Sequence, residues 1–286
     1  MSQPLSIRRI GWAGYEITTE GGTRVVIDPY LHGSEGRLSG LPESPITVEE
    51  LAGAAVVAVT HVGFDHRAQA IDIALAGEAI LISGPALCQV ALDSGVPGDR
   101  CGEILSGCTF QHADVTIRPL PARHWSSMTW KGQFIADQPM SFMLTTAGGS
   151  RIFCGGDTSL SIDMQTWGEL CAPHVAVLGI GGLQVGPVKI VELPPADAAI
   201  AAEWLGVSHL LPVHYPPGDP APDHLRHELT QRGSAIDVFA LEFGDTWTES
   251  CPVGQTGDAD VHLRPPGDRG HGLSGGNVTG AWERGL

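Results

Sequence analysis

Residues 60–66 read Thr-His-Val-Gly-Phe-Asp-His (THVGFDH), and they follow a run of small apolar residues from Leu51 to Val59. The Val-rich end of that run is typical of a buried strand. A loop after such a strand would present His61, Asp65 and His66 within six positions, and imidazole and carboxylate groups are common ligands in hydrolytic metal sites. The alternative is a polar turn whose histidines cap the following helix. By itself the stretch leaves both interpretations open.

Three later segments each carry a histidine or an aspartate just after an apolar run. His124 stands in PARHW, Asp157 in FCGGDT and His214 in LPVHY. Loops at strand ends can aim several side chains at one point. It is the resemblance of these segments, in this order, to a known family that favours a metal site over a helix cap.

Together these segments resemble the metallo-β-lactamase superfamily over about residues 5–247. THVGFDH resembles the H-x-H-x-D-H motif of that family, with Gly63 in place of the second histidine. The resemblance is nearest to the branch that holds L-ascorbate-6-phosphate lactonase, N-acyl phosphatidylethanolamine phospholipase D and many predicted metal-dependent hydrolases. It implies an α/β fold, a four-layer αβ/βα sandwich, with the site at the mouth between two sheets.

The resemblance also implies two groups of metal ligands. One ion would be held by His61, His124 and Asp157, and the other by Asp65, His66, Asp157 and His214. Since glycine offers no ligand at position 63, we expect one firmly held divalent ion and leave a second open. Zn suits this ligand mixture, with Mn and Fe as alternatives. Gly63→His is expected to raise the metal occupancy.

The implied reaction is attack by metal-bound hydroxide on a small ester, lactone, amide or phosphodiester substrate. Asp65 or Asp157 would orient the water or carry its proton, and Tyr215 would donate to the leaving group or oxyanion. For Tyr215 the alternative is a packing residue. Two other functions stay open: a non-hydrolytic redox or lyase-type metalloenzyme on the same fold, and a catalytically degenerate binding domain.

Several neighbours of these residues have two interpretations. Asp28, which precedes Pro29, would orient a ligand histidine or simply start a turn. Four residues are candidate walls of a substrate pocket, or else core aromatics and tight turns: Trp125, Trp130, Gly181 and Gly182.

The composition limits the partners. Lysine and arginine total 16 against 32 acidic residues, a formal net charge of −16, which argues against nucleic acid and anionic membrane surfaces. No apolar run has the length of a membrane span, and the six cysteines form no C-x-x-C pair. We therefore expect a cytoplasmic protein with reduced thiols and a small-molecule substrate. Self-association stays open.

The chain divides into two parts by composition. Residues 1–250 alternate expected strands and helices, and residues 251–286 are Gly-rich without apolar period, which is typical of disorder. Strands are expected at 6–10, 14–19, 24–27, 79–82, 108–113, 115–120, 141–146, 151–154, 174–180, 210–213 and 236–241. Helices are expected at 67–75, 85–94, 195–206 and 225–233, and residues 184–193 are expected to form a lid-like segment.

Overall fold

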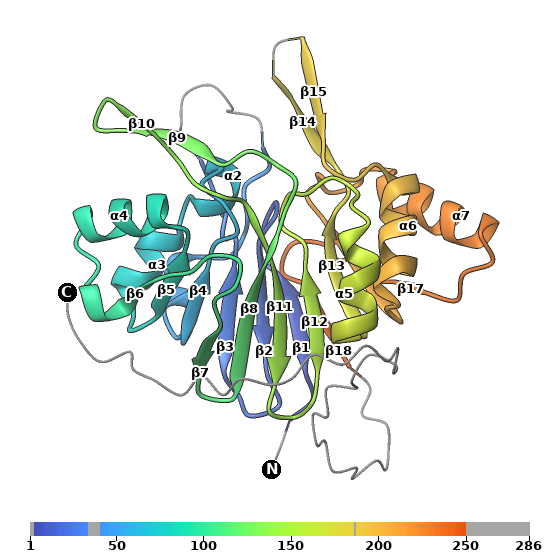
Figure 1. Cartoon of the computed structure of the whole chain (residues 1–286), viewed down its shortest axis with the longest axis horizontal. Helices are drawn as coiled ribbons and strands as arrows, with labels where there is room; N and C mark the ends of the chain where they lie inside the picture. The colour runs from blue at the N-terminus through green and yellow to red at the C-terminus, as the bar shows by residue number, and fades with distance from the viewer. Residues whose placement is uncertain (1–2, 34–40, 186, 250–286) are drawn as a thin grey trace, which may run out of the picture. The chain divides into compact units, whose positions relative to one another are not determined.

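The computed structural model describes residues 3–33, 41–185 and 187–249, and two mixed sheets form its centre (Figure 1). The first sheet contains, in spatial order, β18 (Thr246–Thr248), β1 (Ser6–Arg9), β2 (Tyr15–Thr18), β3 (Arg24–Ile27), β4 (Val56–Ala58), β5 (Ile80–Ser83) and β6 (Cys101–Glu103). The second contains β17 (Asp237–Val238), β16 (His209–Val213), β13 (Val175–Gly179), β12 (Arg151–Cys154), β11 (Met140–Thr146), β8 (Val115–Pro121) and β7 (Phe110–His112).

The two sheets share one pairing pattern. In the first, the three pairings from β18 to β3 are antiparallel and the three from β3 to β6 are parallel. In the second, the pairings from β7 to β12 are antiparallel and those from β12 to β17 are parallel. Each half of the fold therefore brings the ends of parallel strands to the edge where chain loops can gather.

Helices cover the outer faces of both sheets. The first sheet is covered by α1 (Val48–Leu51), α3 (Ala70–Ala76) and α4 (Pro85–Asp93), and the second by α5 (Asp163–Cys171), α6 (Pro195–Leu205) and α7 (Ala221–Gln231) (Figure 1). One core cluster lies between the sheets, and one lies between each sheet and its helices. The predicted αβ/βα sandwich is thus confirmed.

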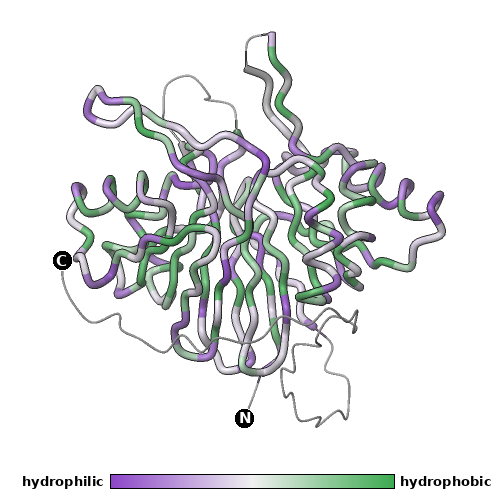
Figure 2. The backbone as a smooth tube through the Cα atoms, viewed as in Figure 1, coloured by the Kyte–Doolittle hydropathy of each residue, from purple (hydrophilic) through white to green (hydrophobic). Residues whose placement is uncertain are grey.

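The burial of β3 on both faces explains its apolar sequence. Val25 and Ile27 point into the core between the sheets, whereas Val26 packs against the helices outside. The same alternation holds in β4, where Val57 faces outward. Strands with two buried faces read as continuous apolar runs, and the corresponding ribbons are largely green in Figure 2.

The helix predicted at 67–75 is wrong at its start. A short helix, α2 (Phe64–Arg67), begins inside the motif, and α3 follows after a break at Gln69. The side chain of Gln69 forms hydrogen bonds outside the helices: it accepts from the Leu31 amide and donates to the His32 carbonyl. Asp65 and His66 therefore lie on a helical turn and not on a loop.

Two hairpins project at the end of the sheets where the motif lies (Figure 1). The hairpin of β9 (Ser127–Trp130) and β10 (Gln133–Ala136) was not predicted. Its two turn residues, Lys131 and Gly132, have φ of 47° and 78°, which is typical of a type I′ turn. The lid-like segment is a second hairpin, β14 (Gly182–Val185) and β15 (Val188–Val191).

The disorder predicted for residues 251–286 falls outside the described residues, so the structure does not test it.

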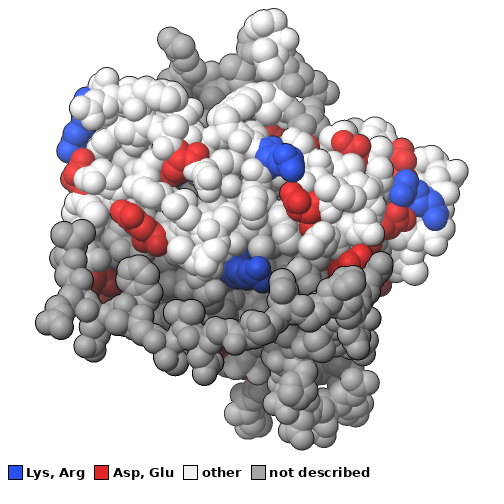
Figure 3. All heavy atoms as spheres, viewed as in Figure 1, with Lys and Arg blue, Asp and Glu red and all other residues white. Residues whose placement is uncertain are grey.

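Three further predictions concern cysteines, membrane spans and surface charge. The five described cysteines are free. Within the described ranges, no helix is long and apolar enough to cross a bilayer. On the face drawn in Figure 3, Lys and Arg are scattered among Asp and Glu and do not gather.

Arg9, at the end of β1, ties together segments far apart in the sequence. Its side chain is 1% exposed. The guanidinium donates to the carbonyls of Gly11 at 3.3 Å, Leu241 at 2.8 Å and Tyr215 at 2.6 Å. It also lies 4.1 Å from the centre of the Tyr215 ring. A buried cation with these partners holds the segment after β16 in place.

Replacing Arg9 with Met should lower the free energy of unfolding by about 2–4 kcal/mol, because three buried carbonyls lose charged donors. Arg8→Met is the matched control: Arg8 reaches solvent and pairs with Glu50 at 3.3 Å, so its loss should cost less than about 1 kcal/mol. Urea unfolding of both variants checks this. Equal losses would show that the Arg9 contacts contribute nothing beyond a surface pair.

Candidate metal centre

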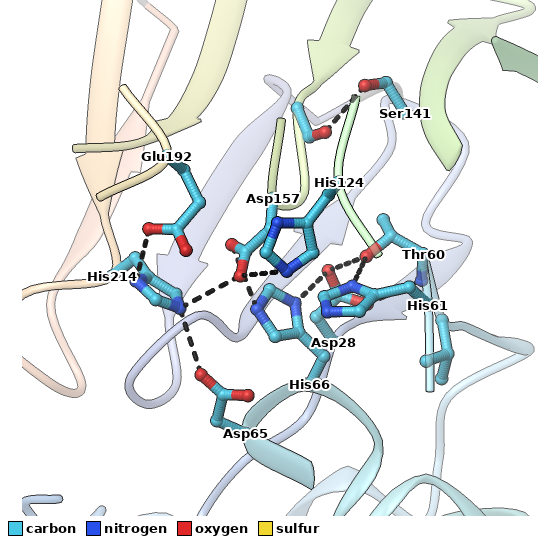
Figure 4. A network of polar contacts seen from close by, with 12 residues as sticks. Asp28, Thr60, His61, Asp65, His66, His124, Ser141, Asp157, Glu192 and His214 are labelled. Carbon is cyan, nitrogen blue, oxygen red and sulfur yellow. Dashed lines mark hydrogen bonds and ion pairs between the residues drawn. The ribbon is translucent and has the colours of Figure 1, made fainter. Parts of the chain in front are cut away.

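The candidate ligands converge at one edge of the two sheets (Figure 4). His61 follows β4 of the first sheet, and three others follow strands of the second: His124 after β8, Asp157 after β12 and His214 after β16. Asp65 and His66 enter from α2. The strand ends place these side chains together although the chain separates His214 from Asp65 by 149 positions.

The first group consists of Asp65, His66, Asp157 and His214, all buried, with ligand atoms within 4.8 Å of one another. His66 Nε2 lies 3.1 Å from Asp157 Oδ1. His214 Nε2 lies 3.1 Å from Asp65 Oδ2 and 3.4 Å from Asp157 Oδ2. Two imidazoles and two carboxylates thus face one point.

The second group consists of His61, His124 and Asp157, again within 4.8 Å. His124 Nε2 is 3.7 Å from Asp157 Oδ2, and the His61 ring centre is 5.0 Å from that of His124. Asp157 belongs to both groups. The structure therefore brings together all six residues predicted as ligands, in the two groups implied by the resemblance.

Hydrogen bonds between Nδ1 and the side chains of Thr60 and Asp28 orient the rings of His61 and His66. Thr60 donates its hydroxyl proton to Asp28 Oδ2 at 2.7 Å, so its oxygen can only accept from His61 Nδ1, 3.2 Å away. Asp28 Oδ2 also lies 2.9 Å from His66 Nδ1. Both rings are thereby turned with Nε2 toward the centre, as neighbouring carboxylates do for metal-binding histidines.

Glu192, just after β15, lies beside Nδ1 of His214, as Thr60 and Asp28 lie beside Nδ1 of His61 and His66. It was not singled out from the sequence. Its side chain is buried, and Oε2 lies 3.6 Å from His214 Nδ1. The sequence offered only a weak signal, an acidic residue in the apolar run KIVEL. Burial together with the charge of Asp157 raises the pKa of Glu192 to about 7.

The charges of the site suit a cation. Burial and the neighbouring His66 lower the pKa of His61 to about 3, so its ring is neutral. Despite burial, the carboxylates of Asp157 and Asp65 raise the pKa of His214 to about 9. His66 Nε2 and Asp157 Oδ1 are buried and make no hydrogen bond, although they lie 3.1 Å apart as an ion pair, so a further group between them would satisfy both. A divalent ion fits these donors and would replace the protons on the histidines.

Gly63 has a reason to be glycine that the sequence did not reveal. A Cβ built there would lie 2.4 Å from His61 Nε2 and 3.2 Å from Asp65 Oδ1. The His61 ring thus fills the space that a side chain at position 63 would enter. Gly63→His can add an imidazole only by displacing His61, so the expected gain in metal occupancy loses its structural basis.

A cavity of about 620 Å³ opens onto the centre. Asp65, Asp157, His61 and His124 lie in its lining, and both Trp125 and Trp130 stand in its wall. Gly181 and Gly182 are not among its lining residues. A Cβ on Gly181 would lie 2.0 Å from the His214 carbonyl oxygen, so this glycine permits close packing of backbone and does not form a pocket wall.

Tyr215 is the one predicted catalytic residue that the structure does not bring to the centre. Its ring belongs to the core cluster between the second sheet and its helices, under the guanidinium of Arg9. It is 3% exposed and does not line the cavity. Because the Tyr215 ring is packed in this core, the packing interpretation of Tyr215 replaces the catalytic one.

Comparison with known proteins agrees with this geometry. Residues 23–215 match the family described as "Beta-lactamase superfamily domain", and the chain belongs to the metallo-β-lactamase superfamily. Hydrolases of the UPF0173 metal-dependent hydrolase family are 30% identical over 247 residues in Methanopyrus kandleri and 31% identical over 232 residues in Korarchaeum cryptofilum. These alignments cover 85% and 80% of this chain, and 99% and 93% of the relatives. The chain is thus a member of that family, a metal-dependent hydrolase.

Solved structures show the same fold. Igni18, a metallo hydrolase from Ignicoccus hospitalis, superposes with a TM-score of 0.70 at 22% identity, over 87% of this chain and all of that one. An isothiocyanate hydrolase from Delia radicum gut bacteria gives a TM-score of 0.66 at 16% identity, over 86% and 99%. At these identities the likeness concerns the fold.

Glu192→Gln should change the pH dependence of stability in the metal-free protein. A carboxyl whose pKa rises from 4.5 to about 7 on folding favours the folded state at low pH, and this contribution is lost as pH rises through about 7. The variant should therefore gain about 1–3 kcal/mol over the wild type between pH 5 and pH 8.

Thermal unfolding in chelator across this pH range is the measurement, with Glu169→Gln, on the exposed face of α5, as the matched control. Parallel stability curves for Glu192→Gln and the wild type would contradict the burial of an ionisable group beside Asp157.

Proposed function

We propose that Asp65, His66, Asp157 and His214 form one site that holds a divalent ion firmly, and that His61, His124 and Asp157 form a second, weaker metal site. The observation that supports this is the convergence of six buried or half-buried donors, from the strand ends of both sheets and from α2, in two groups whose ligand atoms lie within 4.8 Å of one another. We propose Zn as the ion, with Mn or Fe as alternatives, since nitrogen and oxygen donors suit all three.

We propose hydrolysis of a small ester, lactone or amide, with a phosphodiester as the remaining substrate class. A bound ion would make a water nucleophile available near neutral pH and polarise the substrate oxygen. Asp65, which lines the cavity, is the group that we assign to take the proton of the water, with Asp157 as the second candidate.

The outer contacts give the site its rigidity. Asp28 and Thr60 fix the rings of His66 and His61, and Glu192 lies against the ring of His214. These residues keep each Nε2 lone pair directed inward before an ion arrives, which lowers the cost of binding. The family membership favours hydrolysis over a redox or lyase reaction and over a degenerate binding domain.

Asp157→Ala should remove both sites, because Asp157 alone belongs to both groups. The metal content per chain should fall toward zero, and hydrolysis should drop by more than the ~100-fold typical of outer partners. Elemental analysis and a panel of γ-butyrolactone, 4-nitrophenyl acetate and bis(4-nitrophenyl) phosphate measure the two effects. Asp237→Ala, at an exposed side chain, should leave both unchanged. Retained metal in Asp157→Ala would refute the shared ligand.

Gly63→Ala should selectively weaken the second site. The added methyl group must displace the His61 ring, whose Nε2 it would approach to 2.4 Å, whereas Asp65 Oδ1, at 3.2 Å, has to give by only a few tenths of an ångström. Metal titration should therefore show a loss of any weaker ion, by about tenfold or more in affinity, with the firm ion retained. Gly98→Ala is the control, since its Cβ would have room. Unchanged binding of a second ion in Gly63→Ala would show that His61 is not a ligand.

A further inference from the structure

The cavity above the candidate metal centre has one apolar wall built by the β9–β10 hairpin and its approach. Apolar side chains line the cavity from two sides: Val62, Phe64, Trp125, Met128, Trp130 and Ile190. None of these residues is a candidate metal ligand, so the metal centre alone does not explain why this part of the cavity is apolar. A volume of about 620 Å³ lies within the range of small-molecule sites.

Trp125 is the unusual member of this wall. The indole is 56% exposed, although an exposed tryptophan leaves a large apolar area in water. Its ring stacks on the His124 ring, with centroids 4.7 Å apart and an interplanar angle of 20°. The ring is thus held beside the candidate ligand with much of its surface open to a flat apolar group.

The wall is fixed in place at both ends of the hairpin. At the base, Ser126 donates to Asp137 Oδ1 and accepts from the Val62 amide at 3.2 Å. At the tip, Trp130 Nε1 and Lys131 Nζ both donate to Asp93 Oδ2, at 3.0 Å and 2.8 Å. Asp93 belongs to α4. A preformed wall of this kind binds its ligand with little loss of conformational freedom.

Away from the candidate metal centre, the hairpin wall of the cavity offers no cationic side chain to an anionic substrate body. Asp65, Asp157 and Glu192 line the cavity, and within the described residues Arg67 is its one Lys or Arg. Arg67 Nε donates to the Val62 carbonyl at 3.0 Å. On the hairpin, Lys131 forms an ion pair with Asp93 at 2.8 Å. On the hairpin side, a second anionic group on the substrate would meet indole rings and apolar side chains, and no Lys or Arg of the hairpin lines the cavity there to pair with it.

From this wall and these charges we infer that the cavity takes a neutral substrate with a flat, apolar body, seated against Trp125 and the β9 side chains. One part of this inference rests on the proposed function: the ester, lactone or amide group that reacts would point toward Asp157. The apolar body of the substrate is inferred from the cavity alone. An aryl- or alkyl-substituted lactone is a substrate of this kind, and water opens its ring C–O bond to give the hydroxy acid.

The first test measures binding without turnover. The neutral fluorophore N-phenyl-1-naphthylamine is titrated into zinc-loaded wild-type, Trp125→Ala and Trp125→Phe proteins. We expect one site per chain, about tenfold weaker binding in Trp125→Ala from the lost stacking, and near-complete rescue in Trp125→Phe. Phe134→Ala is the matched control, since Phe134 is a 75% exposed aromatic of β10 outside the cavity lining. Equal binding by all four proteins would overturn the inference.

A sulfonated analogue separates charge from shape. The anion 8-anilino-1-naphthalenesulfonate should bind more than tenfold more weakly than the neutral probe, and equal affinity at a Trp125-dependent site would overturn the claim of neutrality. In the kinetic arm, γ-phenyl-γ-butyrolactone should exceed γ-butyrolactone in kcat/KM, and Trp125→Ala should remove this preference.

The two arms distinguish the two proposals. Probe binding that depends on Trp125, with no hydrolysis of either lactone or of the ester panel, would refute the proposed reaction and leave the apolar cavity standing. Hydrolysis with equal kcat/KM for both lactones, insensitive to Trp125→Ala, would refute the substrate class and leave the hydrolase standing.

Discussion

The buried carboxylate of Asp157 is the constraint on which the rest of the structure depends. A charge that is 4% exposed is stable only with partners, and three histidines surround it: His66 from α2, and His124 and His214 from the strand ends of the second sheet. The charge of the carboxylate raises the pKa of His214 and Glu192. Such a concentration of ionisable groups in the metal-free protein makes sense when a cation completes it.

The sandwich explains why this cluster can form. Two sheets with the same antiparallel and parallel pairings face each other, so their strand ends meet at one edge. Asp28 and His214 have φ of 49° and 69°, a left-handed conformation that is uncommon for residues other than glycine. The backbone of His214 is held by the Trp12 carbonyl at 2.8 Å.

Local pattern predicted much of the fold. Apolar runs marked the central strands within one or two residues, as at Arg24–Ile27 and Arg151–Cys154, because strands buried on both faces must be apolar throughout. The errors lie where local preference is weak or overruled. The β9–β10 hairpin carries mixed residues, β18 is three residues long, and Gln69 leaves the helix for contacts with Leu31 and His32.

The sequence by itself determined the types and order of the six candidate ligands and the layered α/β architecture, since both depend on residue chemistry and on periodicity along the chain. Only the tertiary structure decided which residues share a centre, that Glu192 and Thr60 hold the rings, that Tyr215 turns into the core, and that His61 fills the space at Gly63. These facts depend on contacts between segments up to 149 positions apart. Side-chain direction and available space arise only when those segments pack together.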